Sequence, residues 1–274
     1  MNSLTDQLRQ KGVAKVDRMF GPDTVDRWNE ATSNILNAQA ERSYVSASDL
    51  HRAGVLAEIF SPAVRNAIRQ ISPTAVIYHC HIYEIAANRD KSHIHSGHFA
   101  GWHADDECAP LYHKGDLGFI SMFIHMTDVE TPSNGAFELR PTSPVEPLKH
   151  GQPSIHLLGP AGTGFFFHRS FFHRASPNTS DVRRRVFKLS IQDRGLPHER
   201  RNLPEFNAVH EALRNDDPFL HQLFDTDNQD LNWQLPEVPG AADFDSYVPA
   251  PNSTVALPLP GRLKAMLGTK KLAA

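Results

Sequence analysis

Residues 75–86 read Ala-Val-Ile-Tyr-His-Cys-His-Ile-Tyr-Glu-Ile-Ala, and the hydrophobic period of the chain changes at this point. β-Branched and aromatic residues dominate the stretch, which favours a strand. Before it, apolar residues recur at helical spacing after Gly21-Pro22-Asp23 and again after Ser61-Pro62, where Ser61 would cap the helix. After it, turn residues separate short apolar segments, which predict strands at 117–127, 135–140, 154–158, 163–168 and 183–192.

Helices followed by many short strands indicate a mainly β, α+β fold: an antiparallel barrel of the jelly-roll kind with the N-terminal helices packed outside. A short helix is expected at 4–10, a first strand at 12–20 and a helical segment at 205–224. We interpret residues 1–274 as a single domain with a core of about 11–195. Residues 196–274 would be a helical and Pro-rich C-terminal extension that covers the barrel. The alternation within 75–86 leaves open which of its faces points inward.

Composition limits the classes of partner. The chain has 274 residues, a net charge of −3 and a mean hydropathy of −0.42, so nothing indicates a general affinity for nucleic acid or for an anionic membrane. The N-terminus lacks a basic start followed by an apolar run, and no apolar stretch approaches the ~18 residues of a membrane span. We therefore expect a cytoplasmic protein, and a homodimer stays open. Two cysteines, Cys80 and Cys108, are too few for a disulfide framework.

Two histidines and a carboxylate form a candidate metal site. His103 and Asp105 are two residues apart, and in extended backbone such side chains point to the same side. His173 follows far downstream in an aromatic segment, where spacing alone leaves His168 as an alternative. Two imidazoles and one carboxylate with open positions suit non-haem Fe(II). The alternative is that His103 and Asp105 are surface residues that bind no metal, at the start of the acidic run Asp105-Asp106-Glu107.

An arginine run, Arg183-Arg184-Arg185, begins the last expected strand. Strand alternation places Arg183 and Arg185 on one face with Phe187, Leu189 and Ile191, and Arg184 on the other with Val186 and Ser190. A planar guanidinium can hold a carboxylate through two parallel hydrogen bonds. The alternative for this run is a solvated basic strand edge.

With these residues the chain resembles the phytanoyl-CoA dioxygenase family of Fe(II)/2-oxoglutarate-dependent oxygenases, over roughly residues 11–195. The resemblance implies a double-stranded β-helix of cupin-like type. It assigns His103, Asp105 and His173 as catalytic iron ligands, and Arg184, eleven positions after His173, as the arginine that binds 2-oxoglutarate. It further implies that O2 and 2-oxoglutarate are consumed, that succinate and CO2 are released, and that a small-molecule metabolite is hydroxylated or otherwise oxidised.

The chain departs from the family pattern at two positions. Ala104 stands where members often have Gln, and Ala175 stands where they often have Ser, with Ser176 one step later. Members use both residues to touch 2-oxoglutarate, so the resemblance covers the metal ligands better than the co-substrate contacts.

Two other functions remain as alternatives. His103-Ala104-Asp105-Asp106-Glu107 resembles the motif of zinc-dependent deacetylases, in which the residue matching Asp106 would act as base on a zinc-bound water. Those enzymes carry the motif near the N-terminus after a buried parallel strand. A catalytically silent binding module is the third reading. His93, His95 and His98 precede the metal motif in an expected loop, which could contact substrate, hold a second metal or only face solvent.

Overall fold

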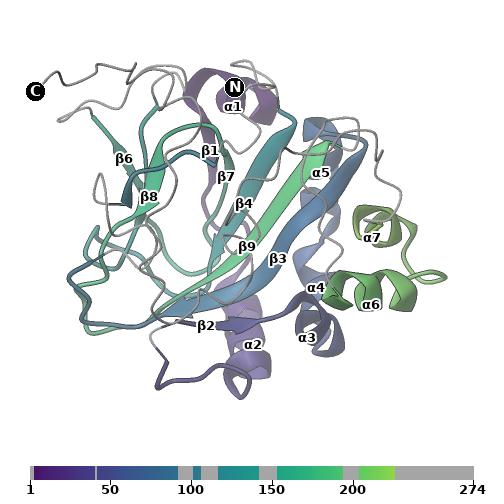
Figure 1. The fold of residues 1–274 in the computed structure, drawn as a ribbon, viewed down its shortest axis with the longest axis horizontal. Coiled ribbons are helices and arrows are strands. Elements are labelled where there is room, and N and C mark those ends of the chain that lie inside the picture. The colour runs from purple at the N-terminus through teal and green to yellow at the C-terminus, as the bar shows by residue number, and fades with distance from the viewer. Residues whose placement is uncertain are drawn as a thin grey trace, which may run out of the picture.

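The computed structural model describes residues 3–40, 42–91, 101–105, 117–141, 153–193 and 204–225, which form a layer of helices and two sheets. In Figure 1 most of the helices gather on one side of a large central sheet, and a small sheet lies on the other side. The helices are α1 (Leu4–Lys11), α2 (Pro22–Ser33), α3 (Ala47–Arg52), α4 (Val55–Ile59), α5 (Pro62–Ile71), α6 (Pro204–Ala212) and α7 (Pro218–Leu223). The strands are β1 (Val13–Val16), β2 (Arg42–Val45), β3 (Ala75–Ile85), β4 (Phe119–His125), β5 (Phe137–Leu139), β6 (Ile155–Leu157), β7 (Gly164–His168), β8 (His173–Ala175) and β9 (Arg184–Asp193).

Both sheets are antiparallel. The large sheet has the strand order β1-β7-β4-β9-β3-β2, and the small sheet has the order β6-β5-β8. The order of strands in the large sheet does not follow their order in the sequence: β9, the last of the described strands, lies between β3 and β4. This order brings the arginine run at the start of β9 beside the end of β3.

Alternation along the strands separates two apolar cores. Met122 and Leu189 of the large sheet pack against the helices, in the first core. Phe123 and Val186, which have the opposite parity, pack in the second core between the two sheets, together with Phe137 of the small sheet. The strands are therefore buried on both faces, which explains their near-continuous apolar sequence. The expected change from helical to strand period near Thr74 is confirmed, since α5 ends at Ile71 and β3 begins at Ala75.

A β-bulge in β3 reverses its parity. Register with β9 shifts between Ile77 and His79, so Ile77 and Cys80 both belong to the helix-side core although they are three positions apart. After the bulge, Tyr83 and Ile85 belong to the core between the sheets. The extra residue is the reason that alternation in the sequence did not reveal the inward face.

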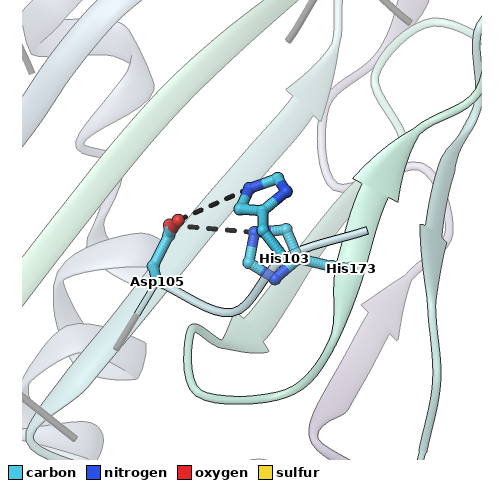
Figure 2. A group of neighbouring side chains, drawn as sticks. All are labelled: His103, Asp105 and His173. Carbon is cyan, nitrogen blue, oxygen red and sulfur yellow. Dashed lines mark ion pairs between the residues drawn. The ribbon is translucent and has the colours of Figure 1, made fainter. Parts of the chain in front are cut away.

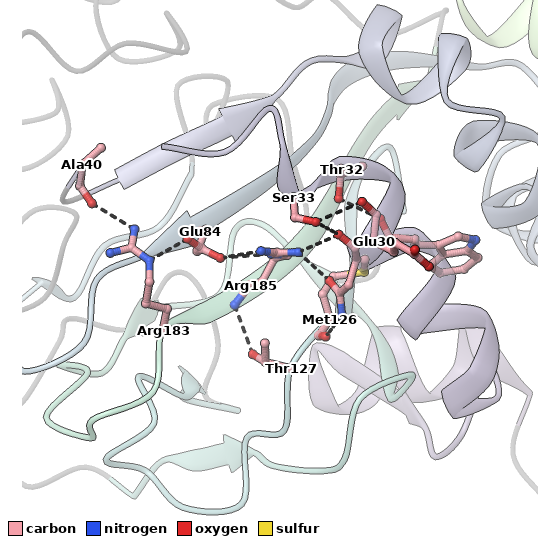
Figure 3. A network of polar contacts seen from close by, with 11 residues as sticks. Glu30, Thr32, Ser33, Ala40, Glu84, Met126, Thr127, Arg183 and Arg185 are labelled. Carbon is pink, nitrogen blue, oxygen red and sulfur yellow. Dashed lines mark hydrogen bonds and ion pairs between the residues drawn. The ribbon is translucent and has the colours of Figure 1, made fainter. Parts of the chain in front are cut away.

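A buried carboxylate ties the layers together on the helix side of the large sheet. Glu84 is 5% exposed and accepts hydrogen bonds from Arg183 Nε at 2.6 Å and from Arg185 Nη2 at 2.8 Å. Arg185 Nη1 also donates to Asn29 Oδ1 in α2, and Arg183 Nη2 donates to the carbonyl of Ala40 (Figure 3). These contacts link α2, β3 and β9.

Several short elements were not predicted from the sequence: α3, α4, β2 and β8. The segment expected to be helical over 205–224 consists of two helices, because Asp217 caps a new helix with its side chain. The loop histidines His93, His95 and His98, Cys108, and the extension from residue 226 onward lie outside the described residues. Among the helices of the described part, none is long and apolar enough to span a membrane.

Candidate metal centre

The structure brings His103, Asp105 and His173 together in one cluster. His103 and Asp105 lie in the short segment 101–105, and His173 begins β8. Reciprocal backbone hydrogen bonds of 3.0 and 2.8 Å pair His103 with His173. Asp105 Oδ1 lies 3.5 Å from His103 Nε2, and Asp105 Oδ2 lies 3.7 Å from His173 Nε2 (Figure 2). Residues 70 positions apart thus face one another because the segment and the strand form a bridge.

Backbone carbonyls fix the orientation of both rings. His103 Nδ1 lies 2.8 Å from the carbonyl oxygen of Gly101, and His173 Nδ1 lies 2.8 Å from that of Phe171. A carbonyl oxygen only accepts, so each Nδ1 carries the proton and each Nε2 keeps its lone pair. Both Nε2 atoms point toward Asp105 (Figure 2). This is the arrangement that a metal-ligating histidine requires.

Electrostatics keep the cluster in the protonation state of metal ligands. Burial lowers the pKa of His103 to about 4, helped by the neighbouring His173, and burial also lowers the pKa of His173. Burial alone would raise the pKa of Asp105, but the guanidinium of Arg169 and the two histidines hold it well below its usual range. At neutral pH the cluster therefore offers two neutral imidazoles and one carboxylate.

The separations between the carboxylate and each histidine fit a divalent first-row ion. Donors that each lie about 2.1 Å from one ion can be at most about 4.2 Å apart. The two histidine–carboxylate separations of 3.5 and 3.7 Å satisfy this limit. Two imidazoles and a carboxylate leave open positions on the ion, as in the facial triad of non-haem iron enzymes.

Arg184 lies on the inner face of β9, where strand alternation had placed it. Its side chain is 2% exposed, and its Nε, Nη1 and Nη2 atoms are buried with no hydrogen-bond partner within the described residues. His125, on the neighbouring β4, has a pKa lowered to about 3 by burial and by the charge of Arg184. A buried guanidinium with no partner in the described part of the chain fits a carboxylate ligand such as the distal carboxylate of 2-oxoglutarate.

His168 does not join the cluster. It shares strand parity with Phe166, which packs against the helices, and its ring contacts Phe171. Its Nδ1 accepts a hydrogen bond from the backbone N–H of Ser170. The choice of His173 over His168 therefore agrees with the side of β7 on which each ring lies.

Asn178 has a different role from the ligands. Its Nδ2 donates to the carbonyls of Ala86 and Val182 at 3.0 and 2.9 Å. It thereby ties the connection between β8 and β9 to the end of β3. This bond sets the course of the chain from His173 to Arg184.

Two cations near the cluster were missed in the sequence. Arg169, in the turn after β7, pairs with Asp105, and Lys188 lies two residues beyond Val186 on the inner parity of β9. The positive charge of Lys188 lowers the pKa of all three cluster residues. Two features of the sequence could have pointed to them. Lys188 has the same strand parity as Arg184, and Arg169 is a charged residue within an aromatic segment.

The inner face of β3 can now be named. His79 faces Ser190 of β9, with His79 Nδ1 and Ser190 Oγ 3.0 Å apart, and His81 contacts the rings of His79 and Tyr83. These side chains lie on the inward face, while Cys80 faces the helices.

The structure also locates residues at which the chain departs from the family pattern. Ala175 is buried at the end of β8, and the hydroxyl of Ser176 is buried without a hydrogen-bond partner in the described part.

The zinc-hydrolase alternative lacks its structural context. It requires a buried parallel strand before the motif, whereas both described sheets are antiparallel and helices α1 to α5 precede His103. Its expected base, Asp106, lies outside the described residues.

Comparisons with known proteins give the family and the fold of the chain. The sequence model of the phytanoyl-CoA dioxygenase family matches residues 37–186, more than half of the chain. No curated protein sequence matches. Among solved structures, the non-haem α-ketoglutarate-dependent epimerase SnoN of nogalamycin biosynthesis is similar with a TM-score of 0.53 at 16% identity, over 69% of this chain and 79% of that one.

Two other solved structures have the same architecture. HygX from Streptomyces hygroscopicus, with nickel and 2-oxoglutarate bound, has a TM-score of 0.54 at 12% identity, over 70% of this chain and 87% of its own. The carbocyclase SnoK of nogalamycin biosynthesis has a TM-score of 0.54 at 18% identity, over 69% and 83%. At these identities the similarity establishes the fold.

Proposed function

The chain belongs to the phytanoyl-CoA dioxygenase family of non-haem iron, 2-oxoglutarate-dependent enzymes, and from this we propose that it hydroxylates or otherwise oxidises a small-molecule metabolite. One observation carries the proposal: a His-Asp-His cluster in the protonation state of metal ligands lies in the same molecule as a buried guanidinium, and the nitrogen atoms of that guanidinium have no hydrogen-bond partner within the described residues. HygX and SnoN were solved with a metal and 2-oxoglutarate bound, which supports the same pair of ligands here.

The chain's own residues have distinct tasks in this proposal. His103, Asp105 and His173 would hold Fe(II), with their Nε2 and carboxylate oxygen atoms as ligands. Arg184 would bind the distal carboxylate of 2-oxoglutarate and so set the orientation of the co-substrate. When bound, iron with O2 and 2-oxoglutarate supplies the oxidising chemistry that yields succinate, CO2 and an oxidised substrate.

The surroundings of the cluster favour this chemistry. The rings of Phe137 and Phe167 lie 5.3 and 5.1 Å from the ring of His173, so this side of the cluster is apolar and excludes water. His79 and His81 lie on the inward face of β3, and we propose that this face contacts the substrate. The large and small sheets would then be the two halves of a double-stranded β-helix that encloses the reaction.

We extend the proposal to the protein's setting. We propose a small-molecule substrate and no nucleic-acid or membrane partner, since a net charge of −3 gives the chain no general attraction for polyanions. We propose a cytoplasmic, single-domain enzyme with its catalytic core at about 11–195, and the family match over residues 37–186 falls within that core.

An anaerobic titration tests the function. Adding Fe(II) and then 2-oxoglutarate to the protein should produce the visible charge-transfer band of an iron-bound 2-oxo acid, and admitting O2 should release succinate. His173→Ala should abolish both signals, while His168→Ala, which removes an equally buried histidine on the other side of β7, should retain them. Loss of both signals in the His168 variant with their retention in the His173 variant would refute the site. Screening metabolites for stimulated succinate release then identifies the substrate.

A further inference from the structure

A buried ion pair joins the carboxylate of the cluster to an arginine outside it. The side chain of Arg169 is 2% exposed, and its Nε lies 2.8 Å from Asp105 Oδ2. This is the same oxygen that lies 3.7 Å from His173 Nε2, while Oδ1 is the oxygen nearer to His103. The arginine contact therefore fixes the rotation of the carboxylate about its Cβ–Cγ bond and sets which oxygen faces which histidine.

Two aromatic rings hold the guanidinium in place. The Arg169 Cζ atom lies 3.9 Å from the ring centre of Phe119 and 4.5 Å from that of Tyr78. The two rings are packed edge to face, with centroids 5.0 Å apart. Tyr78 reaches this position from the bulge of β3, and Phe119 begins β4. Guanidinium groups favour such ring faces, so the side chain is immobilised before it meets the carboxylate.

The backbone of the same residue also holds the ligand segment. The N–H of Asp105 donates to the carbonyl of Arg169 at 2.8 Å, and the N–H of Arg169 donates to the carbonyl of Phe119 at 3.3 Å. Arg169 thus binds Asp105 through both its main chain and its side chain. The main-chain contact places the Cα atom of Asp105, and the side-chain contact orients its carboxylate.

From these contacts we infer that Arg169 is a positioning residue that orients Asp105 for metal binding. The inference rests on the proposed function, because it assumes that Asp105 is a ligand. Arg169 acts through Asp105. Its planar fork can lie against both rings while Nε–H points at one carboxylate oxygen, whereas lysine offers a compact charge with rotatable donors and orients the carboxylate less strictly. Partners that orient a metal ligand commonly contribute 10- to 100-fold in metal affinity.

Cobalt(II) binding tests the inference without relying on turnover. The anaerobic protein is titrated with Co(II), and both the dissociation constant and the visible spectrum of the bound ion are recorded. Relative to the unmodified protein, Arg169→Gln should raise the dissociation constant by about 10- to 100-fold and change the spectrum, because the carboxylate binds the ion in another orientation. Arg169→Lys should give a smaller rise, also with a changed spectrum.

Arg185→Gln is the matched control. It also removes a buried arginine from an ion pair with a carboxylate, but on the helix side of β9, with Glu84. We expect its Co(II) affinity and spectrum to equal those of the unmodified protein even if its melting temperature falls. Any loss caused only by weaker folding would appear in both variants.

A double-mutant cycle separates an effect through Asp105 from a general one. In an Asp105→Asn background, adding Arg169→Gln should weaken Co(II) binding by less than threefold, since the group that Arg169 orients has lost its charge. An unchanged dissociation constant and spectrum in folded Arg169→Gln, or in Arg169→Lys if the glutamine variant does not fold, would overturn the inference. A protein without substitutions that does not bind Co(II) would instead refute the proposed metal site.

Discussion

Replacing Arg184 with methionine should have opposite effects on co-substrate binding and on folding. The guanidinium is 2% exposed, and none of its nitrogen atoms has a hydrogen-bond partner in the described structure. Its desolvation therefore opposes folding until an anion binds. Methionine is unbranched and apolar, so it can occupy the same space without that penalty. We expect Arg184→Met to unfold at a temperature equal to or higher than that of the parent protein.

The binding loss can be bounded. Truncating one partner of a buried, hydrogen-bonded charge pair costs about 2–5 kcal/mol. At about 1.4 kcal/mol for each tenfold change, this raises the dissociation constant of 2-oxoglutarate by roughly 30-fold to several thousand-fold. A concentration of 100 times the parent dissociation constant stabilises the parent by about 2.7 kcal/mol. The same concentration should stabilise a variant weakened 100-fold by only about 0.4 kcal/mol.

Thermal unfolding with and without 2-oxoglutarate, in the presence of a non-oxidisable divalent metal, measures both effects at once. Arg185→Met is the control, because Arg185 pairs with buried Glu84 on the opposite face of β9. That variant should lose about 3–5 kcal/mol of stability yet keep its response to 2-oxoglutarate. If Arg184→Met retains the parent's response, or Arg185→Met is the variant that loses it, the assignment of Arg184 is wrong.

Two further predictions concern the scaffold. Glu84→Gln should lower the free energy of unfolding by about 2–3 kcal/mol, because Glu84 binds two arginines while 5% exposed. Urea unfolding checks this against Glu58→Gln, whose half-exposed ion pair should contribute less than about 1 kcal/mol, and equal losses would contradict it. Asp217→Asn keeps the cap of α7 but removes the ion pair with Arg65. Burial raises the pKa of Asp217, yet the hydrogen bonds from Arg65 lower it below 3.8 overall. The carboxylate therefore stabilises the fold above pH 4, and this contribution disappears as the pH falls through the lowered pKa. Unfolding at pH 7 should show the variant less stable by about 1 kcal/mol, and the difference should vanish near pH 2; a constant difference would contradict the assignment.

Elements with a strong internal pattern could be predicted from the sequence, and elements made by pairing could not. The apolar stripe of α5 and the capping Ser61 predict a helix from local information. β2 has four residues and β8 has three, too few to show a period. They are strands because β3 and β5 supply their hydrogen bonds. The faces of β3 were equally hidden, because the register shift at its bulge depends on β9.

The same distinction between local and long-range information applies to the residues of the site. The spacing of His103 and Asp105 showed that both could reach one metal but did not by itself favour this over a surface pair. Strand parity separated Arg184 from its neighbours, because it depends only on residues close in sequence. Choosing His173 over His168 depended on the family pattern. The structure gives the physical basis: β7 ends at His168 and the chain turns before His173, so the two rings lie on different faces of β7.

Arg169 contacts the site through residues that are distant from it in the sequence. It pairs with a carboxylate 64 positions earlier, and its guanidinium is held by Tyr78 and Phe119 from two other strands. The contacts that join these four residues cannot be seen from the sequence neighbours of any one of them. A carboxylate in an apolar interior would take up a proton unless a fixed charge opposed it. The packing that buries Asp105 therefore also has to deliver Arg169, so ligand and positioning residue form one structural unit that only the folded chain assembles.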